Sequence, residues 1–490
     1  MPVRRVDVAS VGLESKQPGL SVINAPEIRT DDTTLSPPPY VRYRDKVSWF
    51  AIFYKSIPES VGLAGIKYAF NPTEIRTRRL FWLFLVLSAM GVTGYQLIDR
   101  SIYFASNPKS VDISVDYDKE KDFPSVAICN YNTFREELVS GTKFGDFLSE
   151  IFLDNESINM TAYQPALEAI HNMTGFYVNA SHTLESTLIT GRWGQEPLTV
   201  ANFTMKMTDW GVCFVFNDEN NGLPKLTLKA AGRRYSLLLT LDAQQFDYFF
   251  EPKGRGSAGF QVVLYDYGTE PDIEDSGFGI APGEMTLAGV DVTEYTNLPP
   301  PHGQCGERVL KYYNYYGRTE CYRECNGDYL LEACGCKTLS MRGDDRECTA
   351  WEFFNCTASA FYDFIENAET VCDCPPDCSR RIYSATVSHV EYPNTFLTSP
   401  LSAVYGLNPA YFQENICGLT VFFKDMTVQR IKQRKAYDFF SLLCDVGGSL
   451  GLWLGGSILT LFEIVDVIGH SAYVYSRTRP QPKSKTTVQR

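Results

Sequence analysis

Two long apolar stretches divide the chain into polar regions. The first, Leu80 to Ile98, has nineteen residues and no charge, and it follows three arginines. At 1.5 Å per helical residue it is long enough to cross the hydrocarbon core of a bilayer. The second stretch extends from Cys444 to Asp466. The pattern therefore predicts a membrane protein with two spanning helices, at 80–102 and 438–470, and with the lipid bilayer as a partner.

The second stretch differs from a lipid-facing anchor because it contains three carboxylates and five glycines. A carboxylate that faces lipid costs at least about 2.5 kcal/mol, so acids in spans usually face a bundle interior or water. Steps of three and four residues put the acids and several small residues on one helical face, which favours a pore-lining helix. The alternative, an anchor whose glycines pack against other helices, leaves the acids unexplained. The face comprises Asp445, Gly448, Leu452, Gly455, Leu459, Glu463 and Asp466.

Charge, sequons and cysteines place the region between the spans outside the cell. Residues 1–79 carry 12 Lys and Arg against 8 Asp and Glu, and residues 471–490 carry 5 against none. The positive-inside rule then predicts a multi-pass plasma-membrane protein with two cytoplasmic tails and an extracellular domain over 103–437. All 14 cysteines and all six Asn-x-Ser/Thr sequons lie in this region or at its edge, as expected of an oxidising compartment. The predicted glycosylation sites are Asn155, Asn159, Asn172, Asn179, Asn202 and Asn355.

The N-terminal tail contains two segments of interest. Residues 1–40 lack hydrophobic periodicity, which predicts disorder. They end in a Pro-Pro-x-Tyr match, in which Pro37, Pro38 and Tyr40 fit the groove of a WW domain; a stiff proline spacer is the alternative. Residues 46–70 are moderately apolar but interrupted by proline and glycines. They predict a re-entrant or interfacial segment.

Between the spans, short apolar or alternating runs predict strands, and helices are predicted around a cysteine-dense block, 305–378. In that block Cys321 and Cys325 lie on one helical face, and Cys372 and Cys374 point the same way in an extended segment, so the pairs can be cross-linked as two rungs. Zinc is the competing interpretation; the oxidising compartment, the absence of a Cys-x2-Cys pair and the absence of interleaved histidines argue against it. No metal or cofactor is expected. The predicted strands are 123–130, 211–217, 235–241, 260–265, 382–388 and 418–423, and the predicted helices are 321–333 and 349–368.

Five motifs follow one another along residues 50–470. They are Phe123-Pro124-Ser125-Val126-Ala127-Ile128-Cys129-Asn130, Gly211-Val212-Cys213-Phe214-Val215-Phe216-Asn217, Cys334-Gly335-Cys336, Cys374-Pro375-Pro376-Asp377-Cys378, and Gly455-Gly456-Ser457 before Ile458-Leu459-Thr460. In this order they resemble the motifs of the degenerin/epithelial sodium channel family, and most closely its acid-sensing and peptide-gated branches.

The resemblance implies a trimeric, voltage-independent, sodium-preferring cation channel that is usually blocked by amiloride. Its partners are two further subunits, identical or different, its permeant ion is Na⁺, and extracellular H⁺ and Ca²⁺ are candidate modulators. The implied fold has two transmembrane helices and a large disulfide-rich α+β ectodomain with finger, thumb (305–378), knuckle, palm and β-ball. Cys417 and Cys444 stay unpaired. The implied bridges are Cys129–Cys213, Cys305–Cys378, Cys321–Cys374, Cys325–Cys372, Cys334–Cys356 and Cys336–Cys348.

The resemblance also assigns roles in the second span. Gly455, Gly456 and Ser457 match the selectivity filter, where small residues let three helices approach and expose carbonyls that replace part of the hydration shell of Na⁺. The family's second helix breaks here, so a single helical face can lose its phase. The expected pore acids and gate residues are Asp445, Glu463 and Asp466, and Cys444, Gly448 and Leu452.

The chain departs from the family at two histidines. Val61-Gly62 aligns with the cytoplasmic His-Gly gating motif, so the histidine is missing. His302 replaces the wrist tryptophan and titrates near neutrality, which makes it a candidate pH sensor, a solvated loop histidine being the alternative. The thumb acids Asp344, Asp345 and Glu347 are either a proton- or calcium-binding pocket or a solvated acidic loop.

The leading interpretation is a ligand-gated, sodium-selective channel subunit, and two alternatives remain. An ATP-gated receptor also has two spans, but the 28 Lys and Arg against 50 Asp and Glu between the tails disfavour phosphate binding. A two-span scavenger or adhesion receptor would not need acids in a span. Enzyme and nucleic-acid functions are not expected, since the five histidines are scattered. Protons, short peptides, bile-acid-like amphiphiles, mechanical load and constitutive opening stay open as the stimulus.

Overall fold

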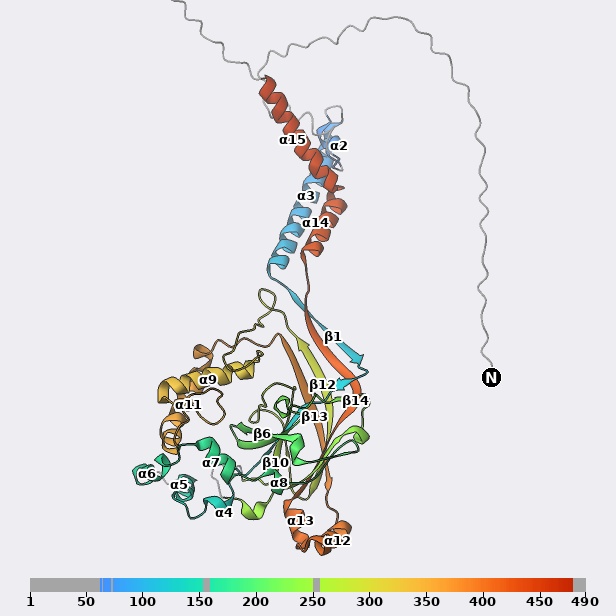
Figure 1. Cartoon of the computed structure of the whole chain (residues 1–490). Helices are drawn as coiled ribbons and strands as arrows, with labels where there is room; N and C mark the ends of the chain where they lie inside the picture. Colours follow the sequence, from blue (N-terminus) through green and yellow to red (C-terminus); the bar gives the residue numbers. More distant parts are fainter. Residues whose placement is uncertain (1–61, 64, 72–73, 153–158, 250–255, 479–490) are drawn as a thin grey trace, which may run out of the picture. The chain divides into compact units, whose positions relative to one another are not determined.

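The computed structural model describes residues 62–63, 65–71, 74–152, 159–249 and 256–478 (Figure 1). Contacts divide the chain into two units, Leu87–Leu454 and a second unit that combines Met1–Val86 with Gly455–Arg490. Within the described ranges, two helices are long and apolar enough to cross a membrane, Arg76–Ala105 and Ile458–Ser476. The described helices in and near the two apolar stretches are α2 (Ile66–Phe70), α3 (Arg76–Ala105), α14 (Phe439–Leu454) and α15 (Ile458–Thr478).

Seven strands form the large sheet of the Leu87–Leu454 unit. They are β1 (Lys109–Tyr117), β4 (Leu188–Trp193), β5 (Glu196–Leu198), β9 (Leu237–Asp242), β12 (Glu284–Thr296), β13 (Ser379–Glu391) and β14 (Ile416–Lys435). Their order is β13-β12-β14-β9-β4-β5, and β1 pairs antiparallel with the last part of β14 (Figure 1). Because β1 follows α3 and β14 precedes α14, this sheet continues directly into both helices.

A smaller sheet packs against the large one. Its order is β11-β10-β3-β7-β6. One apolar core contains residues of both sheets, among them Val126 and Val262 of the smaller sheet and Leu239 and Phe423 of the large one, all fully buried. Each such side chain stabilises the fold by roughly 1.5–3 kcal/mol. The strands are β3 (Ser125–Asn130), β6 (Phe203–Thr208), β7 (Gly211–Phe216), β10 (Phe260–Tyr265) and β11 (Phe278–Ile280), and a separate pair is β2 (Lys121–Asp122) with β8 (Thr227–Leu228).

Short helices surround the sheets. A second core, which includes Phe134, Phe147 and Leu167, joins several of them to Ala350 of the thumb. The helices outside the thumb are α4 (Glu136–Val139), α5 (Lys143–Phe152), α6 (Met160–Glu168), α7 (Met173–Ala180), α8 (Leu184–Thr187), α12 (Thr395–Tyr405) and α13 (Pro409–Asn415).

The thumb is built from α9 (Arg318–Cys334), α10 (Ala350–Glu352) and α11 (Ala358–Val371). Thr349 and Glu352 form a capping box that starts α10 by satisfying free backbone N–H groups. Six disulfides are present, and their pairing is the one that the family resemblance implied. Two of them, Cys321–Cys374 and Cys325–Cys372, form the two rungs between α9 and the segment after α11.

The six predicted strands and the thumb helices are confirmed, but eight of the fourteen strands in the described residues were missed, among them the long strands β1 and β12. β1 alternates apolar and polar residues beyond the first span, a period of two that indicates a strand and was overlooked. β12 does not give a clean period of two, and it has a register shift against β14 between Val290 and Val292. Four other predicted segments lie outside the described residues: the disordered tail, the Pro-Pro-x-Tyr match, most of the re-entrant segment, and the C-terminal tail from 479.

Candidate pore and its surroundings

The second apolar stretch is not one helix. α14 ends at Leu454, residues 455–457 are not helical, and α15 begins at Ile458. Gly455 has φ +62°, in the left-handed region that favours glycine and ends helices. The start of α15 is closed locally, because the Ser457 N–H donates to Thr460 Oγ1 at 3.1 Å and the Thr460 N–H donates to the Ser457 carbonyl. The single face drawn from Asp445 to Asp466 is therefore wrong, since its three- and four-residue spacing is interrupted at the break.

At the other end of α14, Asp445 is held by a residue that sequence reasoning missed. The Tyr437 hydroxyl donates to Asp445 Oδ2 at 2.6 Å. The Tyr437 ring packs edge-on against Tyr103 and Phe104 of α3, with centroid distances of 5.2 and 6.4 Å. The position of Asp445 is thus coupled to both helices. An aromatic residue eight positions before a span acid gave no periodic signal.

The gate candidates lie on the surface of α14 within one chain. Cys444 is exposed, and Leu452 is 79% exposed. A Cβ added at Gly448 would meet nothing within 4 Å. These positions are therefore free to contact other subunits.

A second cross-contact joins the two apolar helices in this unit. Trp453 Nε1 donates to the Gln96 side-chain oxygen of α3 at 3.0 Å. Gln96 is the one amide in the Leu80–Ile98 run. That isolated polar residue was a signal that the sequence analysis did not use.

In the other unit, Glu463 has an intrachain partner. The Gly62 N–H donates to Glu463 Oε2 at 2.8 Å. The Glu463 carboxylate of α15 thus binds the backbone of Gly62, the glycine that aligns with the cytoplasmic gating motif. Asp466, in contrast, is exposed. Val61 lies outside the described residues. Glu463 was expected to face the pore, and its contact with Gly62 was not predicted from the sequence.

The thumb acids do not form a shared site. Glu347 accepts a hydrogen bond from the Thr174 N–H at 3.1 Å, and across the described ranges no three His, Cys, Asp or Glu side chains converge as metal ligands. The acid that meets the thumb is Glu270, which is 9% exposed in its side chain and forms ion pairs with Arg342 and with Lys206, the latter at 3.1 Å. The two acids Asp344 and Asp345 show no ion pair in the part of the chain that is described.

The remaining predicted sites lie in loops and on helix ends. His302 is half-buried, and its Nδ1 has no hydrogen-bond partner among the described residues. Asn202 is half-buried and accepts a hydrogen bond from the Thr199 N–H at 2.8 Å, and Asn155 lies outside the described residues. The other four sequon asparagines, Asn159, Asn172, Asn179 and Asn355, are exposed.

The comparisons with known proteins agree with this arrangement. The family model for the amiloride-sensitive sodium channel matches residues 59–467. Acid-sensing ion channel 1C of Danio rerio is 28% identical over 429 residues, which cover 83% of this chain and 81% of the relative. Acid-sensing ion channel 1 of Gallus gallus is 28% identical over 462 residues, or 88% and 87% of the two chains, and acid-sensing ion channel 2 of Homo sapiens is 28% identical over 83% and 84%.

A solved structure of a proton-activated chloride channel covers 81% of this chain and 96% of that chain. Its TM-score is 0.30 and its sequence identity 7%, too little likeness to support an argument.

These observations define a two-span membrane channel with a disulfide-rich α+β ectodomain. The chain belongs to the amiloride-sensitive sodium channel family. It is a plasma-membrane sodium channel subunit and not an enzyme, and members of this family assemble as trimers.

Proposed function

We propose that the chain is a subunit of a ligand-gated, sodium-selective, voltage-independent and amiloride-sensitive cation channel. It forms a homotrimer or joins different subunits, and both of its tails are cytoplasmic. The basic tails, the sequons between the spans and the similarity to acid-sensing ion channels support this assignment. The Pro37-Pro38-Pro39-Tyr40 segment is then placed where a cytoplasmic WW-domain protein can reach it.

The observation that carries the proposal is the interruption of the second apolar stretch at Gly455, Gly456 and Ser457. A helix whose backbone is satisfied internally exposes no carbonyls, whereas a break inside a span is tolerated only where protein or water surrounds it. Small side chains at such a break let three copies bring carbonyl and hydroxyl oxygens close to an axis. Those oxygens can replace part of the hydration shell of Na⁺.

The acids and the large sheet supply the other parts of the mechanism. Asp445, half-buried in the first half of α14, attracts cations by its charge, and Tyr437 fixes its orientation. Gating by an extracellular ligand requires that ectodomain motion reach the helices. β1 and β14 are paired from Lys109↔Lys435 to Tyr117↔Thr427 and run directly into α3 and α14, so a shift of this pair moves both helices together.

The test of the filter is the reversal potential of cysteine variants. In Gly456→Cys and Ser457→Cys channels, we expect a changed Na⁺-to-K⁺ permeability ratio or loss of current, with surface expression retained. Gly91→Cys is the matched control, because it enlarges a glycine of α3 with nothing within 4 Å. Unchanged reversal potentials in both filter variants would contradict the assignment, and a surface-expressed wild type that never conducts would favour a non-channel receptor.

A second experiment addresses the stimulus. Whole-cell current is recorded during steps of extracellular pH, with and without short amidated peptides, and then with amiloride. A current evoked by either stimulus identifies a ligand class, and block by amiloride tests the pharmacology. Current that is constant under every condition would show a constitutively open channel and refute ligand gating by these stimuli.

A further inference from the structure

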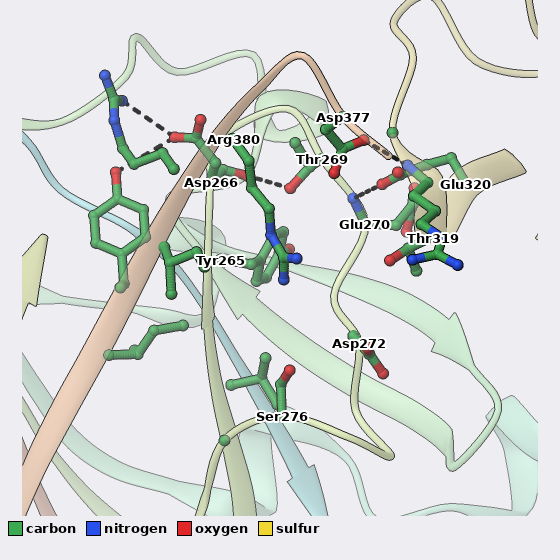
Figure 2. Close-up of a pocket in the computed structure, with 18 of the residues that line it drawn as sticks. Tyr265, Asp266, Thr269, Glu270, Asp272, Ser276, Thr319, Glu320, Asp377 and Arg380 are labelled. Carbon is green, nitrogen blue, oxygen red and sulfur yellow. Dashed lines mark hydrogen bonds and ion pairs between the residues drawn. The ribbon is translucent and has the colours of Figure 1, made fainter. Parts of the chain in front are cut away.

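A cavity lies beside the outer strand of the large sheet. It has a volume of about 580 Å³, which is typical of sites for drug-sized ligands. Figure 2 shows its walls. They are residues 379–385 of β13, the end of β10 with the loop that follows it, and the first turn of α9 with the tyrosines before it.

Most charged groups of this cavity already have partners. Asp266 accepts from Arg381 and from the Tyr383 hydroxyl, each at 3.3 Å. Glu320, 4% exposed, accepts from the Tyr315 hydroxyl at 2.9 Å and from the Glu270 N–H at 3.0 Å. These carboxylates are therefore not available for a cationic ligand.

The same holds at the start of α9. Asp377 Oδ1 accepts from the Arg318 N–H at 2.7 Å, so a carboxylate of the chain itself already caps this helix. Glu270 is neutralised by its ion pairs with Arg342 and Lys206. The helix end thus contributes no open anion site, and any anion selectivity must come from side chains.

Two arginines of the lining, Arg380 and Arg318, have no ion pair among the described residues, and Arg318 lies 5.4 Å from the Tyr322 ring centroid. Figure 2 shows Arg380 extending into the cavity, with no contact drawn from its guanidinium. Three lining acids also lack an ion pair with any described residue, and each accepts a hydrogen bond from the protein: Glu320, Asp377 and Asp272, the last from the Asp275 N–H at 3.3 Å. The charged donor that extends into the cavity without a partner among the described residues is therefore the Arg380 guanidinium.

The apolar part of the lining is largely aromatic. Ring faces and edges alternate with hydroxyls of serine and threonine, so the cavity offers both stacking and hydrogen bonds. The aromatic lining residues are Tyr265, Phe278, Tyr315, Tyr316, Tyr322 and Tyr383.

We propose that this cavity binds an amphipathic carboxylate, an aromatic body that carries one carboxylate group. Arg380 pairs with the carboxylate through its fork of N–H donors, Arg318 adds positive charge at the rim, and the tyrosines pack against the body. The carboxylate can belong to a free small molecule or to the C-terminus of a peptide that ends in an aromatic residue. That this ligand controls the pore rests on the proposed channel function; that it binds does not.

A series of ion pairs connects the cavity to β1, the strand that follows α3. Arg381, next to Arg380, pairs with Glu294 of β12 at 2.9 Å. The other oxygen of Glu294 accepts from Arg430 of β14 at 2.9 Å, and Arg430 pairs with Asp116 of β1 at 3.0 Å. The hydrogen bond from Arg430 holds the pKa of Asp116 below its usual value, so the Asp116 carboxylate of this series of ion pairs stays charged near neutral pH.

This series of ion pairs can transmit the effect of ligand binding from the cavity to the pore helices. Arg380 and Arg381 are consecutive in β13, so their side chains point to opposite faces of the strand. A carboxylate held by Arg380 therefore affects the ion pairs of Arg381 through a shift of the strand that both residues share. The four strands β13, β12, β14 and β1 are cross-linked by these pairs, and two of them continue into α3 and α14.

The test is direct binding to the full-length channel, purified in lipid nanodiscs. The probes are 2-naphthylacetate and its uncharged amide, and the peptide Gly-Gly-Phe with a free or an amidated C-terminus. Titration calorimetry should show binding of the carboxylate forms and at least roughly tenfold weaker binding of the amides, as expected for loss of a charged hydrogen-bond partner. Binding of naphthylacetate without the peptide points to a small molecule, and binding of the free-acid peptide shows that a C-terminus fits.

Two variants assign the binding to the cavity. Arg380→Gln should lower the affinity for the carboxylate probes roughly tenfold or more. Arg192→Gln, an exposed arginine of β4 that does not line the cavity, should leave the affinity unchanged. Equal affinities of acids and amides, or an Arg380→Gln channel that binds like the wild type, would overturn the proposal. The proposal would also be overturned if no probe bound to the trimer, as would happen if a neighbouring subunit filled the cavity.

Current measurements separate this proposal from the channel function. If the probes bind through Arg380 but the protein conducts under no condition, the site stands and the channel proposal fails. If the channel conducts with the expected selectivity but no probe binds, the site proposal fails alone. If both hold, Glu294→Gln should retain binding and alter the current that the probe evokes.

Discussion

The substitution of Cys444 by larger residues tests whether three copies of α14 close the pore. Within one chain Cys444 is exposed, and a Cβ at Gly447 or Gly448 would meet nothing within 4 Å. A phenyl group at position 444 therefore meets open space in the single chain. Any steric penalty must come from neighbouring copies, and it must be largest where α14 helices approach most closely.

The size of the effect follows from the cost of overpacking. Extra volume in a packed contact costs roughly 1–3 kcal/mol. If that cost falls on the closed state alone, the open-to-closed ratio rises about 5- to 140-fold, at about 1.4 kcal/mol per decade. We expect standing current without ligand in Cys444→Phe and a smaller standing current in Cys444→Val, and none in Cys444→Ala.

A positively charged thiol reagent applied from outside provides an independent assay. Twelve cysteines are in disulfides, and Cys417 is fully buried. Burial also raises the pKa of the Cys417 thiol far above its usual range, which suppresses the reactive thiolate. Cys444 is thus the reactive thiol, and modification should evoke sustained current in the parent and none in Cys444→Ala.

One pair of results would refute the reasoning. If the modified parent stays silent, and if Cys444→Phe opens no more readily than the parent at equal surface expression, the closed state does not pack at this position. Mass spectrometry of the modified channel confirms that the reagent reached the thiol.

Two further predictions concern pH. His302→Trp removes a titratable group at the wrist and should shift the pH–current curve by a measurable fraction of a unit; superimposable curves would leave His302 as a structural loop residue. In the thumb, hydrogen bonds from Arg346 lower the pKa of Glu352 to about 2, from 4.5. This depressed pKa stabilises the folded thumb above about pH 4.5, and the contribution is lost as the pH falls toward 2. Thermal unfolding followed against pH should show a smaller loss over that window in Glu352→Gln, and an equal loss in both proteins would contradict the linkage.

The sequence by itself determined the parts of this protein that depend on local pattern. Helix lengths, the short strands, the cysteine block and the oxidising compartment follow from periodicity and composition, because neighbouring residues specify them. The break at Gly455 was implied by the family resemblance and not by the local pattern, which gave one continuous helical face; the glycine permits the left-handed backbone that ends α14. The six disulfide pairs were implied by the family resemblance, whereas spacing alone indicated only that Cys321 and Cys325 can be cross-linked to Cys372 and Cys374.

Only the tertiary structure decided which polar groups meet. Gly62 and Glu463 are 401 positions apart, and no pattern within either segment reports their hydrogen bond. Tyr437 orients Asp445 because the strand-to-helix junction turns its ring onto α3. Arg380 faces a cavity because β13 is the outer strand of the sheet. Such contacts depend on how packed elements juxtapose side chains, and that information is absent from the order of residues in any one element.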